Sequence, residues 1–100
     1  MKYNKLVRDN IPEIITSKGR EAITHIATDA EYWEKLKEKL AEEVQEFTES
    51  ESVEEVANIL EVIDTIIAYK KFASEDIEKT KSEKAQKRGR FDKRIILDES

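Results

Sequence analysis

The chain of 100 residues contains no cysteine, one proline, two glycines and one histidine. The absence of cysteine excludes disulfides, thiolate metal sites and cysteine nucleophiles. A single histidine, His25, leaves no multi-histidine metal site and no Ser-His-Asp triad. So little glycine and proline argues against a β-sandwich or barrel, which needs many tight turns.

Long hydrophobic runs are missing as well. No uncharged stretch reaches the roughly 18 apolar residues that a membrane-spanning helix needs. The polar start of the chain, residues 1–9, lacks the apolar region of a signal peptide. We therefore expect a cytoplasmic protein with no membrane partner.

The charges present are strongly segregated along the chain. Charged residues make up 41% of the sequence and hydrophobic residues 38%, a balance that allows a folded core. Residues 40–69 contain nine acids and no lysine or arginine, whereas residues 79–94 contain eight bases and two acids. The acidic stretch could bind a cation and the basic stretch could bind phosphate. Alternatively, the two stretches are simply solvated helix faces of opposite charge.

Apolar spacing and capping residues predict one mainly all-α domain over residues 1–100. We expect helices at 11–18, 30–47, 53–72 and from 74 to near 89, the second and third forming an antiparallel hairpin of a helical bundle. Thr28 with Glu31 and Ser52 with Glu55 have the spacing of capping boxes. Two short β-branched stretches, 22–27 and 94–97, are candidate strands that could pair as a small sheet.

The expected helix at 53–72 is apolar on two sides, which predicts self-association. One stripe runs from Val53 to Ile67, and the other contains Ile59, Val62 and Ile66. Three main helices can hardly cover both stripes, so we expect a homodimer or homotetramer whose subunits meet through the second stripe.

The carboxylates of the predicted hairpin have a mirrored spacing. Glu43 and Glu46 are three residues apart on one helix, and Glu55 and Asn58 are three apart on the next. With the turn centred at 50–51, Glu46 faces Glu55 and Glu43 faces Asn58. Repulsion between carboxylates at this distance is relieved by a hard divalent cation, which predicts Mg²⁺, with Mn²⁺ as a substitute. Glutamates that are simply solvated remain the alternative.

These residues resemble those of a known family. The pattern E-E-x-x-E at 42–46, followed by an acidic pair on the next helix, is similar to that of the all-α NTP pyrophosphohydrolases, which include MazG-type enzymes and phosphoribosyl-ATP pyrophosphohydrolase. The opening YNKLVRDNIPEII at 3–15 and the ending RGRFDKRIIL at 88–97 resemble a small MazG-like branch. The resemblance implies Mg²⁺-dependent cleavage of a nucleoside triphosphate to a monophosphate and pyrophosphate, including house-cleaning of non-standard nucleotides.

The resemblance also implies roles for individual residues. The metal ligands would be Glu43, Glu46, Glu55 and Asn58, and Glu42 or Glu46 would take the proton of the attacking water. Substrate phosphates would be bound by cations from two regions, namely Lys5, Arg8, Lys84 and Arg88.

Asn58 departs from the family pattern, because the resembling enzymes carry aspartate there. This leaves open a weak enzyme, an enzyme in which Glu61 or Glu42 compensates, and an inactive nucleotide-binding protein. Glu61 with Asp64 is an alternative second pair with the same spacing. A helical interaction protein without chemistry is the alternative from another class. Nucleic-acid binding through residues 79–94 is disfavoured by the net charge of −5 and the scarcity of aromatic residues there.

Overall fold

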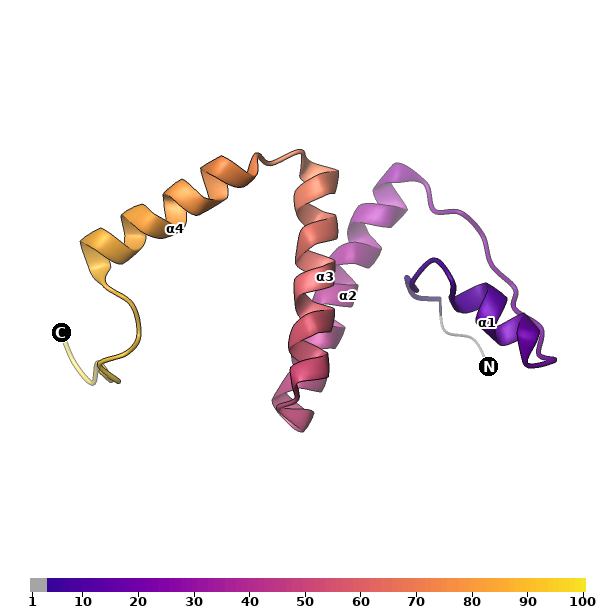
Figure 1. The fold of residues 1–100 in the computed structure, drawn as a ribbon, viewed down its shortest axis with the longest axis horizontal. Coiled ribbons are helices and arrows are strands. Elements are labelled where there is room, and N and C mark those ends of the chain that lie inside the picture. Colours follow the sequence, from indigo (N-terminus) through magenta and orange to yellow (C-terminus); the bar gives the residue numbers. More distant parts are fainter. Residues whose placement is uncertain (1–3) are drawn as a thin grey trace. The chain divides into compact units, whose positions relative to one another are not determined.

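A computed structural model describes residues 4–100 and shows an all-helical chain (Figure 1). The helices are α1 (Ile11–Ser17), α2 (Asp29–Ser50), α3 (Val53–Lys70) and α4 (Ser74–Arg88). Over residues 4–100 there is no β-strand, so the predicted all-α class is confirmed. The chain divides into two compact units, Met1–Ile66 and Ile67–Ser100, and the boundary falls within α3.

Side-chain caps fix the starts of the two long helices. The Thr28 hydroxyl accepts a hydrogen bond from the Glu31 backbone N–H at the start of α2 (3.3 Å). The Ser52 hydroxyl accepts one from the Glu55 backbone N–H at the start of α3 (3.2 Å). Between the helices, Glu51 ends α2 in the left-handed conformation (φ 51°), and its N–H is bonded to the Phe47 carbonyl oxygen (2.7 Å).

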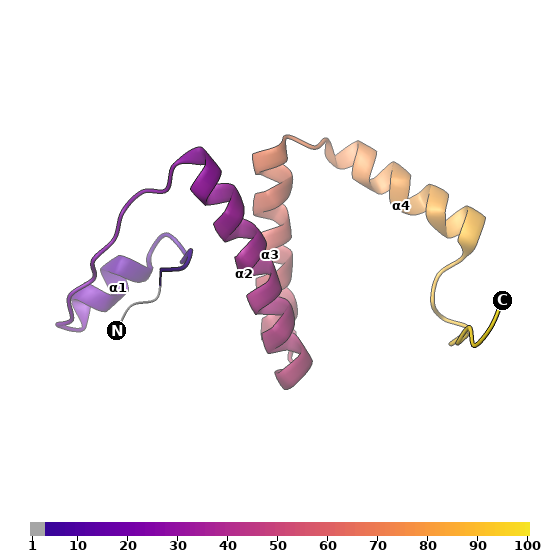
Figure 2. The same ribbon diagram turned by 180° about the vertical axis from the view of Figure 1, so that it is seen from behind.

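Helices α2 and α3 form the centre of the first unit. Only two residues separate them, and within this unit α3 runs back along α2 in both views (Figures 1 and 2). Leu36 from α2 and Val62 from α3 are the buried apolar residues of the described chain, and Glu43 is the buried charged residue. A glutamate therefore occupies one of the three most protected positions between these helices.

The two apolar stripes of α3 differ in exposure. Val62 is buried, and its stripe neighbours Ile59 and Ile66 are half-buried. In the other stripe Val56 and Leu60 are exposed, at 41% and 55% of their surface. Ile67 of this stripe is half-buried, so the stripe that includes Val62 is the more buried of the two without being fully covered, and a contact between subunits stays a prediction.

The two predicted strands are wrong. Residues 22–27 and 94–97 are irregular, and neither segment forms a ladder of backbone hydrogen bonds within residues 4–100. Their apolar side chains are exposed, including Ile26 at 96% and Ile95 at 77%. β-Branched residues favour a pleated, half-buried surface, and without a neighbouring strand and burial the preference is not expressed.

The second unit consists of the end of α3, helix α4 and the irregular residues 89–100. Helix α4 has no buried residue, and its last turn carries Lys87 and Arg88. Among residues 4–100, no helix is both long and apolar enough to cross a membrane.

Candidate metal and phosphate site

Three carboxylates converge where α2 and α3 lie together. Glu43 and Glu46 are one turn apart on α2, and Glu55 is in the first turn of α3. One oxygen from each carboxylate lies within 4.8 Å of the others. The short turn between the helices brings Glu55 back over the end of α2, so residues from separate helices share one small volume.

Glu43 is the least accessible member of this acidic cluster. Its residue is 6% exposed, and its Oε2 has no hydrogen-bond partner within the described part of the chain. Burial raises the pKa of Glu43, and a side-chain hydrogen bond with Glu55 and the negative charges of Glu46 and Glu55 raise that pKa further, while Lys39 lowers it. The surroundings therefore disfavour the ionised form of Glu43 even with Lys39 beside it.

Lys39 and Lys5 are the cations beside the cluster. Lys39 Nζ lies 3.3 Å from Glu42 Oε2 and 3.5 Å from Glu43 Oε1. Lys5 Nζ donates a hydrogen bond to Glu42 Oε1 (2.9 Å), and together the lysines lower the pKa of Glu42. Glu42 is thus neutralised by two lysines, which makes it a poor proton acceptor.

Asn58 and Arg8 connect the cluster to the N-terminal segment. Arg8 Nη2 donates to Asn58 Oδ1 (2.9 Å), and Asn58 Nδ2 donates to Glu55 Oε2 (3.3 Å). These contacts bring together residues that are 50 positions apart in the sequence. Lys5 and Arg8 are therefore both bonded to side chains of the hairpin at or next to the acidic cluster.

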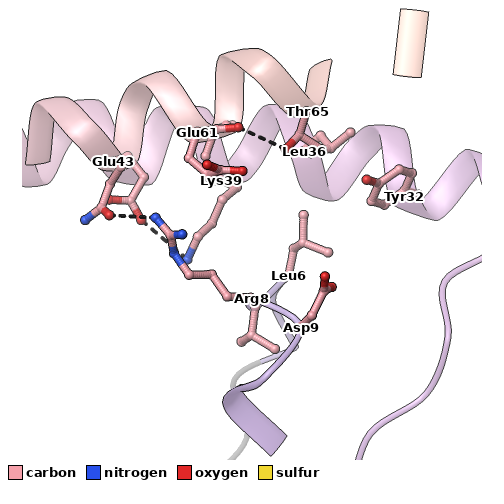
Figure 3. Close-up of a pocket in the computed structure, with 12 residues that line it drawn as sticks. Leu6, Arg8, Asp9, Tyr32, Leu36, Lys39, Glu43, Glu61 and Thr65 are labelled. Carbon is pink, nitrogen blue, oxygen red and sulfur yellow. Dashed lines mark hydrogen bonds and ion pairs between the residues drawn. The ribbon is translucent and has the colours of Figure 1, made fainter. Parts of the chain in front are cut away.

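A cleft of about 230 Å³ lies beside these residues. Figure 3 shows Arg8, from the N-terminal segment, and Lys39, from α2, pointing toward the Glu43 end of the cleft. The rest of the lining is mixed: Leu6, Tyr32 and Leu36 contribute apolar surface, and Asp9 and Glu61 contribute carboxylates. The cleft thus offers both charged groups and apolar surface to a ligand.

The other residues singled out in the sequence are placed differently. Glu61 lines the cleft but is not part of the acidic cluster, and Asp64 is exposed and does not line the cleft. Lys84 and Arg88 are on α4 in the second unit. His25 is exposed and its Nε2 lies 2.9 Å from Glu31 Oε1, so it forms a surface pair with the helix start.

Sequence reasoning missed two parts of the site. Lys39 precedes Glu42 and Glu43 by three and four positions, and this spacing could have identified the pairing. The contribution of Leu6, Val7 and Asp9 to the cleft wall carries no such signal, because these residues precede any regular element. Only tertiary packing brings them to the hairpin.

The residues present fit a hard divalent cation. Such ions take oxygen ligands, and the cluster offers three carboxylates from two helices. Exposed acidic groups often gather without an ion, but Glu43 Oε2 is buried and has no hydrogen-bond partner among residues 4–100, which is a second observation that suits a cation ligand.

Comparison with known proteins gives one partial match. An uncharacterized protein of Mycolicibacterium smegmatis is 50% identical over 42 residues, which are 42% of this chain and 43% of that protein. No family model matches the chain, and no solved structure matches it. Because the aligned part covers less than half of either protein, the function must be inferred from the residues and geometry of the site.

Proposed function

We propose that this protein is a Mg²⁺-dependent nucleoside triphosphate pyrophosphohydrolase of the all-α, MazG-like type. The main support is Glu43, a buried glutamate inside a cluster of three carboxylates, one oxygen of which has no hydrogen-bond partner in the part of the chain that the structure describes. The motifs at the two ends of the chain, which resemble the small MazG-like branch, add support.

Charge explains why a cation is needed at such a site. A triphosphate carries up to four negative charges, so carboxylates alone would repel it. Mg²⁺, when bound, would polarise the phosphoryl oxygens and activate an attacking water. Glu43, Glu46 and Glu55 are the residues that would hold it.

Glu46 is the better candidate for the proton acceptor. Glu42 is bonded to Lys5 and lies against Lys39, and its pKa is lowered by them. Glu46 is affected by the charge of Lys5 but, unlike Glu42, is not hydrogen-bonded to it. Glu46 would therefore ligate Mg²⁺ through one carboxylate oxygen and use the other to orient a water and accept its proton.

The cleft divides the substrate between two environments. Arg8 and Lys39 line its charged end and would neutralise the phosphates. The nucleoside would lie against the apolar part of the lining, which includes Leu6, Tyr32 and Leu36. In this proposal the phosphates lie at the Glu43 end of the cleft and the nucleoside lies farther from Glu43.

Self-association is part of the proposal, as a homodimer or homotetramer. Val53, Val56 and Leu60 of α3 are exposed, and Val44 of α2 is exposed as well. Burying this face against a second copy would remove apolar surface from water and stabilise the hairpin.

The test is a pyrophosphate-release assay with standard and modified nucleoside triphosphates and Mg²⁺. Wild type should release pyrophosphate, and Glu43→Gln should lose about a hundredfold in rate if a ligand is lost. Glu49→Gln on an exposed part of α2 is the matched control and should retain activity. No release with any nucleotide contradicts the proposed enzyme. Mg²⁺ and nucleotide binding without release would instead identify a binding protein.

A further inference from the structure

Asn58 is bonded on both sides of its amide. Its Oδ1 accepts from Arg8 Nη2 at 2.9 Å, and its Nδ2 donates to Glu55 Oε2 at 3.3 Å. The partners fix the orientation of the amide, because a guanidinium can only donate and a carboxylate can only accept. Reversing the amide would lose both hydrogen bonds.

This geometry gives Asn58 a different role from that of a metal ligand. The amide oxygen that would bind a cation is already used by a positively charged group. We propose that Asn58 is a positioning residue, which transmits the constraint of Arg8 to the metal-binding carboxylate of Glu55. The inference rests on the proposed Mg²⁺ site.

Glu55 is restrained at its backbone and at its side chain. Its N–H is bonded to the Ser52 hydroxyl at 3.2 Å, which fixes the start of α3. Its carboxylate is held by Asn58, which is held in turn by Arg8. Without this chain of hydrogen bonds the carboxylate can rotate away from Glu43, and cation binding is then weakened by the entropy lost in ordering it.

Arg8 has the donor capacity for this role and for a second one. A guanidinium carries five N–H donors, and the Asn58 contact uses one nitrogen. Arg8 also lines the cleft, so its other donors are available to an anionic group there. The residue that orients a metal ligand is thus the same one that can contact substrate phosphate.

The test measures Mg²⁺ binding to the full chain by calorimetry, without nucleotide. The variants are Arg8→Gln, Asn58→Leu and the double variant, with Arg20→Gln as a control for loss of an exposed arginine. Each single variant should weaken Mg²⁺ binding by about tenfold, the lower range for residues that orient a ligand. The double variant should be no weaker than Asn58→Leu alone, because the same connection is already broken.

Two results would overturn the inference. If Arg8→Gln tightens Mg²⁺ binding, Arg8 acts only as a nearby repelling charge. If Arg8→Gln changes the Mg²⁺ affinity by the same factor in wild type and in Asn58→Leu, Arg8 and Asn58 act independently. Melting curves of each metal-free variant show whether that variant folds. The signals of the Asn58 side-chain amide in nitrogen-15 spectra should shift in Arg8→Gln both with and without Mg²⁺. A wild-type protein that binds no Mg²⁺ contradicts the proposed function itself, whereas binding with independent effects contradicts only the positioning role.

Discussion

Replacing Glu43 by glutamine should stabilise the metal-free protein and abolish most of its stabilisation by Mg²⁺. Glu43 is buried, its Oε2 has no hydrogen-bond partner within residues 4–100, and Glu46 and Glu55 lie close by. Where Glu43 is ionised, the wild-type chain folds with this charge in place, against desolvation and against two like charges, which Lys39 offsets only in part. Glutamine keeps the shape of the side chain and removes the charge.

The size of the effect is set by the cost of an unsatisfied buried group, about 1–3 kcal/mol and more when charged. Glutamine retains one oxygen in the same place, so we expect the lower end, about 1 kcal/mol. For a chain of this size that raises the melting temperature by about 4–8 °C. At a Mg²⁺ concentration about 100 times Kd, wild type gains about 2.7 kcal/mol, which reverses the order of stability.

The pH dependence has a definite sign. The pKa of Glu43 is raised in the folded chain above its ordinary value of 4.5, because burial penalises the charged form. Between these two values the folded state binds more protons than the unfolded state, so metal-free stability falls as pH rises through that window. Above the folded pKa the penalty is complete and constant. Glu43→Gln lacks this contribution.

The assay is thermal unfolding of wild type, Glu43→Gln and the exposed control Glu49→Gln, with a chelator and with Mg²⁺, between pH 4 and pH 8. With chelator present, the difference in melting temperature between Glu43→Gln and wild type should grow as pH rises and then become constant. A variant less stable than wild type at pH 7 in chelator, or an advantage that does not change with pH, would refute the reasoning.

Three other experiments, with five substitutions between them, test separate parts of the structure. Lys5→Ala should bring the pKa of Glu42 back up toward its ordinary value, measured by carbon-13 titration of the carboxylate, because Lys5 provides its strongest hydrogen bond. The Lys5–Glu42 pair is partly exposed, so its contribution to the free energy of unfolding should stay below about 1 kcal/mol. This contribution is present above pH 4.5 and is lost as pH falls through the lowered pKa of Glu42. Glu46→Gln should reduce kcat about a hundredfold in the pyrophosphate-release assay, and Glu42→Gln much less. Leu60→Glu should shift the mass in light scattering toward monomer while the helices persist, because Leu60 is exposed in the single chain. Ile59→Glu should instead lower the melting temperature, because Ile59 is half-buried beside Val62 in its stripe.

Each of these has a contrary outcome. A Glu42 pKa that does not respond to Lys5→Ala would mean that the hydrogen bond is not formed in solution. Equal losses in Glu46→Gln and Glu42→Gln would remove the assignment of the proton acceptor. A wild-type monomer at micromolar concentration would contradict self-association.

The helices could be predicted because their signals are local. Thr28 and Ser52 are capping residues that act within one turn, and the apolar spacing after each of them has the helical period. The predicted bounds of α3 and α4 differ from the observed ones by two residues or fewer. The strands failed for the opposite reason, because a strand exists only with a partner and residues 22–27 and 94–97 have none among residues 4–100.

The site was predictable only in part. The pairing of Glu46 with Glu55 can be inferred from helix spacing and the position of the turn, and the structure places both in the acidic cluster. Burial of Glu43 could not be read from the sequence, since the same spacing suits a solvated edge. The contacts of Arg8 and Lys5 depend on how an irregular segment packs on the hairpin, which no periodic pattern encodes.

The two-residue turn between α2 and α3 has a consequence for how the sequence can change. Each residue added to a helix rotates the residues after it by about 100° and advances them by about 1.5 Å. If one residue were inserted next to Glu51 and absorbed into α3, Glu55 would point away from Glu43, although every ligand would still be present in the sequence. Deleting one residue there would rotate Glu55 away from Glu43 by a similar angle in the opposite direction. Substitutions at 51–52 can be compensated locally, whereas a change in length there cannot, so the count of residues between Glu46 and Glu55 constrains the site as strictly as their identity.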